Sequence, residues 1–223
     1  LSMAFIIDGT TGIATVDGSV AAPSQRGQDS NSGISYAADT IKFSTGGVER
    51  MAITNSGVTG ISTGITEADI WRLSQDVGGS QGTLSTLSSW ERADDPSATY
   101  IGTGMSFESS GAHFYFPSTG KYLINVQLNL YGQYAFHFGW LVTQFRSNGS
   151  ASYEQTALAM ATVSGNGGYG GGFSHCLVDV TESGSSGARV YFQQQTQSSA
   201  GRFISGNTDK NQTSVAFIRL GDT

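Results

Sequence analysis

The three histidines are the first residues to consider for acid–base or metal chemistry, because imidazole titrates near neutral pH and ligates metals. They are His113, His137 and His175, and no two of them have the i, i+4 spacing of a helical zinc site. His175 precedes the single cysteine, Cys176. On a strand these neighbours would point to opposite faces, which disfavours a thiolate–imidazole pair. Cys176 would lie on the same face of the strand as Val178 and Val180, so we interpret it as a small buried residue.

A glycine-rich stretch, 165–170, has the G-x-G-x-x-G spacing of dinucleotide-binding loops. That chemistry needs a strand before the loop and a helix after it, so that the helix N-terminus meets the pyrophosphate. Here the sequence from Phe173 onward continues with the pattern of a strand. We therefore interpret the glycines of 165–172 as a flexible hairpin tip that displays Tyr169, without a nucleotide.

Two local groups of carboxylates could in principle hydrolyse a glycoside or bind calcium. The first is Glu91 with Asp94 and Asp95, and the second is Asp179 with Glu182. Both lie at expected loops or strand ends, where acidic residues are usually solvated. A calcium site at the two aspartates stays open as an alternative, although the EF-hand spacing is absent. We expect no catalytic residues, no metal site and no cofactor, so the chain is not expected to be an enzyme.

The composition excludes several classes of partner. The chain has 223 residues with 31 glycines, only 13% charged residues and a formal net charge of −6. A nucleic-acid-binding protein would need a basic surface, so no nucleic acid is expected. The net negative charge also argues against electrostatic attachment of the protein to an anionic cell envelope. No apolar run approaches 20 residues and no secretion signal is evident, so no membrane insertion is expected.

The elements that must position these residues are strands. In 121–131 the even-numbered residues are apolar, whereas the odd-numbered ones include Asn125, Gln127 and Asn129. This period of two indicates one buried and one mostly polar face. In the run 134–142 the aromatic residues occupy even-numbered positions. Gly132-Gln133 predicts a short hairpin between this run and 121–131. Further runs follow at 152–163, 172–181, 188–197 and 213–220.

No amphipathic helix of three turns is evident in the sequence, so we predict an all-β chain built around an antiparallel sandwich. Residues 1–62 form short apolar runs broken by turn residues, including a β-hairpin around Gly46-Gly47. Such a small segment has little core, and we expect it to be a β-hairpin-rich attachment and trimerisation segment. Residues 63–223 are predicted to form the sandwich.

One strand shows a pattern that suggests another subunit. In 173–179 both parities carry apolar residues, which indicates burial on both faces. A second copy of the chain would cover the second face, although a loop or the N-terminal segment is an alternative cover. The candidate trimer-interface residues are Leu123, Tyr131, Phe173, His175 and Leu177.

The stretch 116–124, Phe-Pro-Ser-Thr-Gly-Lys-Tyr-Leu-Ile, and the apolar run 213–220 carry a family resemblance. Together with Gly201-Arg202-Phe203, they resemble the C1q-like (TNF-like) trimeric jelly roll. The stretches 67–73 and 90–92 resemble the first strands of bacteriophage and environmental members of that family. Residues 38–51, which contain Phe-Ser-Thr-Gly-Gly-Val-Glu-Arg-Met, are similar to repeats in tail-fibre proteins of marine phages.

The resemblance implies a jelly-roll knob, residues 63–223, that forms a homotrimer, with the segment 1–62 joining it to other virion proteins. The implied function is non-enzymatic adhesion of a phage fibre or appendage to a host cell-surface glycan or protein, with the protein located on the virion. Loop position makes Asn166, Tyr169 and Phe203 the candidate receptor contacts. The alternatives are a purely structural head-fibre or capsid decoration and, less favoured, a polysaccharide depolymerase.

Overall fold

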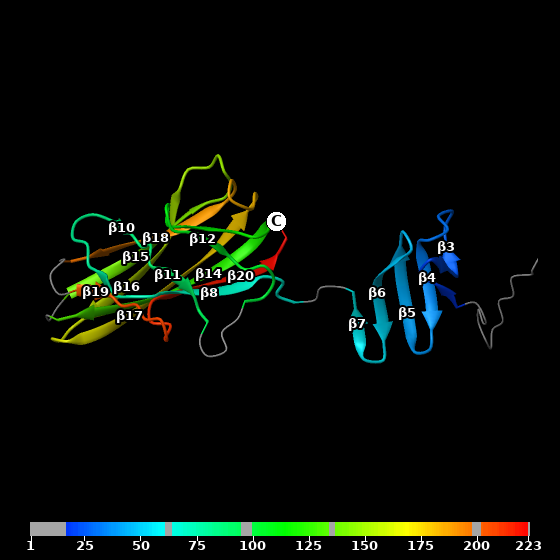
Figure 1. Ribbon diagram of the computed structural model, residues 1–223, viewed down its shortest axis with the longest axis horizontal. Helices are drawn as coiled ribbons and strands as arrows, with labels where there is room; N and C mark the ends of the chain where they lie inside the picture. The colour runs from blue at the N-terminus through cyan, green and yellow to red at the C-terminus, as the bar shows by residue number, and fades with distance from the viewer. Residues whose placement is uncertain (1–16, 61–63, 95–99, 134–136, 198–201, 223) are drawn as a thin grey trace, which may run out of the picture. The chain divides into compact units, whose positions relative to one another are not determined.

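The computed structural model describes residues 17–60, 64–94, 100–133, 137–197 and 202–222, and in these ranges every regular element is a β-strand (Figure 1). The chain divides into two compact units, one ending at Gly64 and the other starting at Ile65. The all-β prediction is therefore confirmed.

The N-terminal unit is a single five-stranded antiparallel sheet with a small hairpin beside it. The hairpin consists of β1 (Gly18–Ser19) and β2 (Ala22–Pro23). The sheet runs in chain order through β3 (Gln25–Arg26), β4 (Gly33–Ala37), β5 (Thr40–Thr45), β6 (Val48–Thr54) and β7 (Gly57–Thr59). Gly46 and Gly47 form the turn between β5 and β6 with φ of 60° and 74°, so the predicted hairpin is confirmed. Two positive φ values in a two-residue turn match the twist of the strands and favour glycine.

One face of this sheet is apolar across four strands. The register places Tyr36, Ile41, Ile53 and Val58 in one row, and the last three of these side chains are exposed. The opposite face buries small residues such as Ser35, Ser44 and Ala52. A single-layer sheet thus keeps an apolar face open to solvent within one chain.

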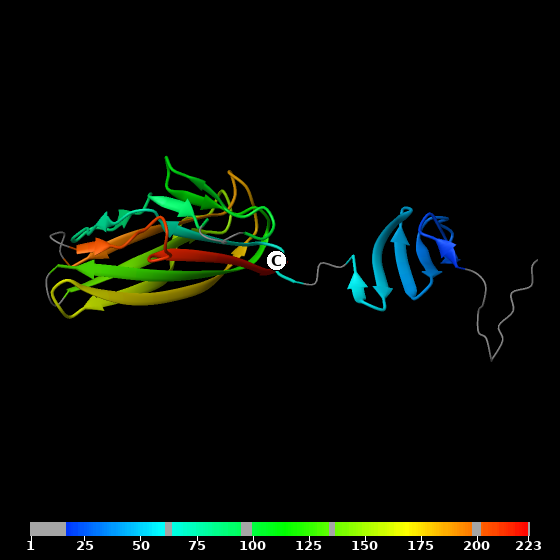
Figure 2. The same cartoon turned by 60° about the horizontal axis from the view of Figure 1, so that its bottom comes forward.

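The C-terminal unit contains two antiparallel sheets that pack face to face (Figure 2). The first, called the β14 sheet, has the order β11-β8-β20-β14, and β17 pairs with β14 along its other side. Beyond the end of β20, the strand β19 pairs with β14, and β9 pairs with β19. Its strands are β8 (Ala68–Leu73), β9 (Val77–Gly78), β11 (Trp90–Arg92), β14 (Gly120–Gly132), β17 (Gly168–Val180), β19 (Arg202–Ile204) and β20 (Ser214–Gly221).

The second sheet, called the β15 sheet, has the order β12-β13-β18-β15-β16, with β10 also paired to β18. Its strands are β10 (Ser85–Thr86), β12 (Ser106–Glu108), β13 (His113–Tyr115), β15 (His137–Arg146), β16 (Glu154–Val163) and β18 (Arg189–Thr196).

The core lies between the two sheets. From β14 it takes the even-numbered residues predicted to be buried, Tyr122, Ile124, Val126, Leu128 and Leu130. A cluster of phenylalanines fills the centre, in which the ring of Phe114 lies 5.3 Å from that of Phe217 and 5.9 Å from that of Phe192. Offset and edge-on aromatic pairs of this kind add to the free energy gained by burial.

The predicted hairpin at Gly132-Gln133 is wrong. β14 and β15 belong to different sheets, so the chain crosses from one layer to the other after Gly132. Alternation alone reports which residues share a face, and it carries no information on which strand is the partner. In β15 the odd-numbered residues face the core, whereas in β14 the even-numbered ones do: Leu141 is buried in the core, and Phe138 is exposed. Residues 134–136 lie outside the described residues.

The glycine-rich stretch 165–172 is mostly strand, not a hairpin tip. Gly168 to Gly172 pair in register with Gly132 to Leu128 of β14. A β-carbon at Gly170 or Gly172 would collide with the backbone of β16, at Thr162 and Met160 respectively. Glycine is needed here because the edges of the two sheets approach closely, which is a packing reason and not a turn requirement.

Candidate functional site

The β14 sheet presents one face to solvent, and the strict alternation of its central strand β14 defines that face. The even-numbered side chains of β14 fill the core, so the odd-numbered ones point away from it. Leu123 on β14 lies in register with Leu177 on β17 and with Ile218 on β20. Adjacent strands therefore carry apolar side chains at the same level of the outer surface.

The exposed side chains on this surface are large. Phe173 is 75% exposed, Leu177 is 68% exposed and Leu220 is 56% exposed. We call the surface formed by Ile70, Leu123, Phe173, Leu177, Ile218 and Leu220 the apolar face. Phe173, His175, Asn125 and Ile70 also line a shallow hollow of about 480 Å³ on it. Contiguous exposed apolar surface of this kind marks an interaction site.

The structure brings together the five residues predicted for a trimer interface. Leu123, Phe173, His175 and Leu177 lie on the outer surface of the β14 sheet, and Tyr131 lies on the same surface at its end. On the other side of β17, Val178 and Val180 are buried in the core. The two-sided apolar pattern of this strand therefore corresponds to one face in the core and one face open to solvent in a single chain.

An aromatic row occupies the end of the same sheet. Tyr131 on β14 lies in register with Tyr169 on β17 and Phe203 on β19. The Tyr131 ring centroid is 4.9 Å from that of Tyr169 and 6.2 Å from that of Phe203. Tyr131 was predicted as a trimer contact and the other two as receptor contacts, but the three form one cluster. Tyr169 is 66% exposed within β17, whereas Asn166 is exposed in the turn that precedes the strand.

A second apolar surface lies on the outer side of the β15 sheet. The exposed side chains are Phe138 on β15 with Leu158 and Met160 on β16. Trp140 lies in register with Met160, and its ring stacks on that of Phe138 with centroids 5.4 Å apart. The sequence predicted that the aromatic residues of this run share one face of the strand, but it did not predict that this face points away from the core. We call this surface the β16 edge, since β16 is the last strand of its sheet.

No protein-family model matches the sequence, and the search of curated proteins found no match. Among solved structures, Eiger TNF from S. frugiperda is similar to this chain, with a TM-score of 0.51 and 15% sequence identity. The similarity covers 72% of this chain and 96% of that chain. Murine APRIL at pH 8.0 has a TM-score of 0.45 and 13% identity, covering 69% of this chain and 98% of that chain.

The fold is a TNF-like jelly roll. At this identity the comparison establishes the fold, and the fold expected from the C1q-like and TNF-like resemblance is thus confirmed. In the described part of the chain, no helix is long and apolar enough to cross a membrane.

The two histidines whose side chains the structure describes, His113 and His175, lie on different sheets. His113 lies on β13, His175 on β17 and the backbone of His137 on β15. Among the described residues, no group of three or more histidine, cysteine or acidic side chains is placed to hold a metal ion. Cys176 is half-buried, its thiol lies 3.7 Å from the Thr156 hydroxyl, and burial raises its pKa.

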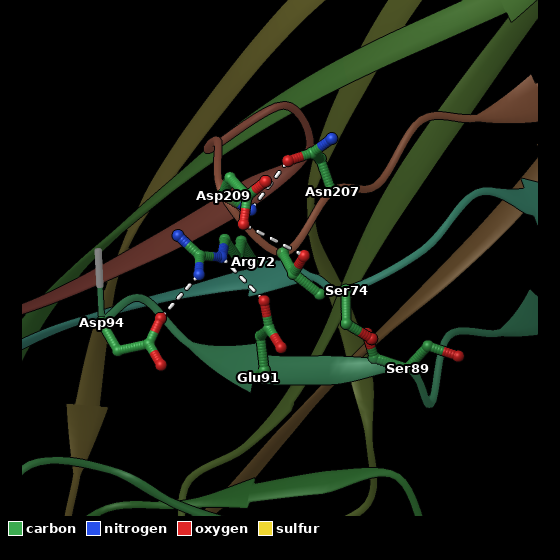
Figure 3. A network of polar contacts seen from close by, with 8 residues as sticks. Arg72, Ser74, Ser89, Glu91, Asp94, Asn207 and Asp209 are labelled. Carbon is green, nitrogen blue, oxygen red and sulfur yellow. Dashed lines mark hydrogen bonds and ion pairs between the residues drawn. The ribbon is translucent and has the colours of Figure 1, made fainter. Parts of the chain in front are cut away.

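The first carboxylate group is engaged by a buried arginine (Figure 3). Arg72 Nε donates to Glu91 Oε1 at 2.8 Å, and its Nη2 donates to Asp94 Oδ1 at 2.7 Å. The hydrogen bond from Arg72 holds the pKa of Asp94 below its ordinary value. Glu91 and Asp94 are therefore structural partners of Arg72. Asp95, the other aspartate considered for calcium, lies outside the described residues.

The second carboxylate group also has structural partners. Asp179 forms an ion pair with Lys121 on the adjacent strand. Glu182 Oε2 accepts a hydrogen bond from the backbone N–H of Gly149 at 2.9 Å. The two acids are therefore tied to different segments of the chain.

Proposed function

We propose that this chain is a phage fibre or appendage protein whose jelly-roll unit forms a homotrimeric knob for non-enzymatic adhesion to a host surface. The observation that carries the proposal is the apolar face, where side chains as large as Phe173 and Leu177 are mostly exposed in one chain. Burying such side chains stabilises by about 1.5–3 kcal/mol each, so a second copy gains substantially by covering them.

The second apolar surface suggests how copies meet. The apolar face is on the outer side of the β14 sheet and the β16 edge is on the outer side of the β15 sheet, so the two can contact each other only between different copies. A contact between two unlike surfaces is heterologous, and it forms a ring if the rotation closes. Closure at three copies is the expectation from the C1q-like resemblance, and both surfaces of each copy are then covered.

The adhesion role rests on the aromatic row. Tyr131, Tyr169 and Phe203 present rings on three adjacent strands, and aromatic rings stack on the flat apolar faces of sugars and peptides. Asn166, in the turn before Tyr169, adds an exposed amide. Three copies of a weak site on one rigid knob raise the effective affinity without any new contact. The segment 1–62 would join the knob to other virion proteins at the particle surface.

Self-association is tested by size-exclusion chromatography with light scattering on the full chain. A trimer of a 23.3 kDa chain has a mass of about 70 kDa. A stable monomer of about 23 kDa would overturn the trimer and, with it, the multivalent mechanism.

Adhesion is tested separately with fluorescently labelled protein on host cells and on particles that lack the protein. Binding to cells that falls in Tyr169→Ala supports the adhesive knob. Binding to such particles without binding to cells would instead indicate a structural decoration. Release of reducing ends from host surface glycan would contradict the non-enzymatic assignment.

A further inference from the structure

The outer surface of the β15 sheet carries a cluster that neither the apolar face nor the aromatic row includes. We call it the arginine–tyrosine cluster, and its members are His113, Tyr115, Arg146, Tyr153, Arg189 and Tyr191. Phe114 and Val190, which alternate with these residues along β13 and β18, are fully buried in the core. The cluster residues on these strands therefore point away from the core.

Two arginines are direct neighbours in this cluster. Arg146 on β15 and Arg189 on β18 lie opposite each other in the strand register. Like charges at opposite positions of neighbouring strands destabilise a sheet. Within the described ranges, no carboxylate lies within 4.0 Å of either guanidinium, although the chain as a whole carries a net charge of −6.

Most of the donors of this arginine pair have no protein acceptor among the described residues. Each guanidinium has five N–H donors. Arg146 donates from Nη2 to the Gly187 carbonyl at 3.3 Å, and Arg189 donates from Nη2 to the Ser185 carbonyl at 2.7 Å. The Nε atoms of both residues are buried without a hydrogen-bond partner. A buried donor without an acceptor costs free energy. The Nη1 atoms of the two arginines are not among the buried atoms, and a bound oxyanion would accept hydrogen bonds from them.

Aromatic rings hold the two guanidiniums in place. The Arg146 guanidinium lies 5.3 Å from the centroid of the Tyr153 ring, and that of Arg189 lies 4.9 Å from the Tyr115 ring. The Tyr153 ring in turn packs edge-on against Tyr191, with centroids 4.8 Å apart, and stacks with His113 at 5.8 Å. Both the tyrosine hydroxyl of Tyr153 and Nδ1 of His113 are buried without a partner.

The nearby carboxylate of Glu108 is already engaged. Its Oε1 accepts a hydrogen bond from the Ser110 hydroxyl at 2.8 Å, and its Oε2 accepts one from the Tyr115 hydroxyl. Glu108 therefore fixes the ring over which Arg189 lies and does not form an ion pair with that arginine. The arginine pair stays available for an external anion.

We propose that the arginine–tyrosine cluster binds an acidic saccharide, with the sugar carboxylate between Arg146 and Arg189 and the sugar ring against the tyrosines. Adjacent guanidiniums suit a carboxylate because they present parallel donors, and aromatic rings suit the apolar face of a sugar. A nucleic acid is disfavoured because the chain is acidic overall.

This inference rests on the adhesion role proposed above, and it names a receptor class for the knob. The cluster shares the outer surface of the β15 sheet with the β16 edge, but Arg146 lies six residues along β15 from Trp140. At about 3.3 Å per residue this is roughly 20 Å, so covering the apolar face and the β16 edge in a trimer leaves the cluster accessible. The net charge of −6 suggested recognition without ionic contacts. Because Arg146 and Arg189 are paired on the outer surface of the β15 sheet, we expect an ionic contact at this one surface.

The test is calorimetric titration of the full chain with oligogalacturonate, with its methyl-esterified and therefore neutral form, and with inorganic phosphate. We expect binding of oligogalacturonate that weakens with salt, and at least tenfold weaker binding in Arg146→Gln and in Arg189→Gln. Arg26→Gln, which removes the same charge from an exposed site in the N-terminal unit, is the control and should bind as the unaltered chain does. Thermal melting of each variant verifies that it is folded.

Three results would overturn the inference. These are equal binding of the acidic and neutral oligomers, unchanged binding in both folded arginine variants, and competition by phosphate at the same concentration as the oligomer. The last result would indicate a site for a free oxyanion. Mass and cell adhesion are measured on the same preparations. A trimer that adheres to cells without binding oligogalacturonate contradicts only this inference, whereas a monomer that binds it contradicts only the trimer.

Discussion

Gly172 on β17 lies directly against the carbonyl group of Met160 on β16, and no space for a β-carbon is left between them. The two strands follow each other in the chain but belong to different sheets. Gly170 has the same relationship with Thr162 one repeat earlier. The two glycines therefore set how closely the edges of the sandwich approach next to the exposed side chains of Met160 and Phe173.

Replacing Gly172 with alanine should destabilise the jelly roll by about 1–3 kcal/mol or more, because the new methyl group meets backbone that cannot move aside. Gly171→Ala is a matched control on the same strand, since a β-carbon there has its nearest contact at 3.9 Å, with the Leu128 carbonyl oxygen. Chemical denaturation of both variants measures the difference. Equal stabilities would mean that the two sheets can separate at this edge without cost.

Leu177→Glu should weaken self-association at least tenfold, because each copy would bring a charge into a surface that burial must dehydrate. Ser186→Glu adds the same charge to an exposed loop and should leave the mass unchanged. Sedimentation velocity over a range of concentrations distinguishes the two. An unaltered assembly in Leu177→Glu would exclude the apolar face from the interface.

His113 should make the stability of the jelly roll dependent on pH. Burial, followed by the charge of Arg189 and also by that of Arg146, lowers the pKa of His113, and Glu108 opposes this shift. The folded protein therefore favours the neutral imidazole. The unfolded chain binds a proton near pH 6.5, so stability is full above that pH and decreases as the pH falls below it.

The measurement is the melting temperature at pH 7.5 and at pH 5.5 in the unaltered chain, in His113→Gln and in His175→Gln. His113→Gln should reduce the difference between the two pH values, whereas the exposed His175 serves as the control. A difference that persists in His113→Gln would assign the dependence to other groups.

Arg72→Met should cost about 2 kcal/mol of stability, because it leaves Glu91 without its partner and replaces a buried hydrogen-bonded group. Asp94→Asn should change stability much less, since the Asp94 side chain is 80% exposed and solvent screens its ion pair. Urea denaturation of the two variants tests this order. The reverse order would assign the main role to the exposed carboxylate.

Alternation in the sequence was sufficient to predict the all-β class and the buried residues of β14. It succeeded because β14 pairs with β17 along its whole length and with β20 from Lys121 to Gln127, so each side chain points either into the core or to the outer surface. It also placed Leu123, Phe173 and Leu177 on one surface, since residues that share a parity share a face of the strand.

The remaining features depend on contacts between distant segments. The pairing of Arg146 with Arg189 joins positions 43 residues apart through the β15–β18 register. The role of Gly172 depends on a carbonyl of another sheet. Neither strand order nor the distance between sheets is encoded in a local pattern, which is why the glycines resembled a loop and the crossing after Gly132 resembled a hairpin.

The boundary between Gly64 and Ile65 has a consequence for how such a protein can change over generations. The buried cluster of the jelly roll consists of residues from Leu73 onward, and among the described residues the N-terminal sheet is formed by the strands β3 to β7. A genetic exchange at the codons between these units would therefore join a different knob to the same N-terminal sheet without disrupting either core. Under the function proposed above, such an exchange would replace the host specificity in a single recombination event.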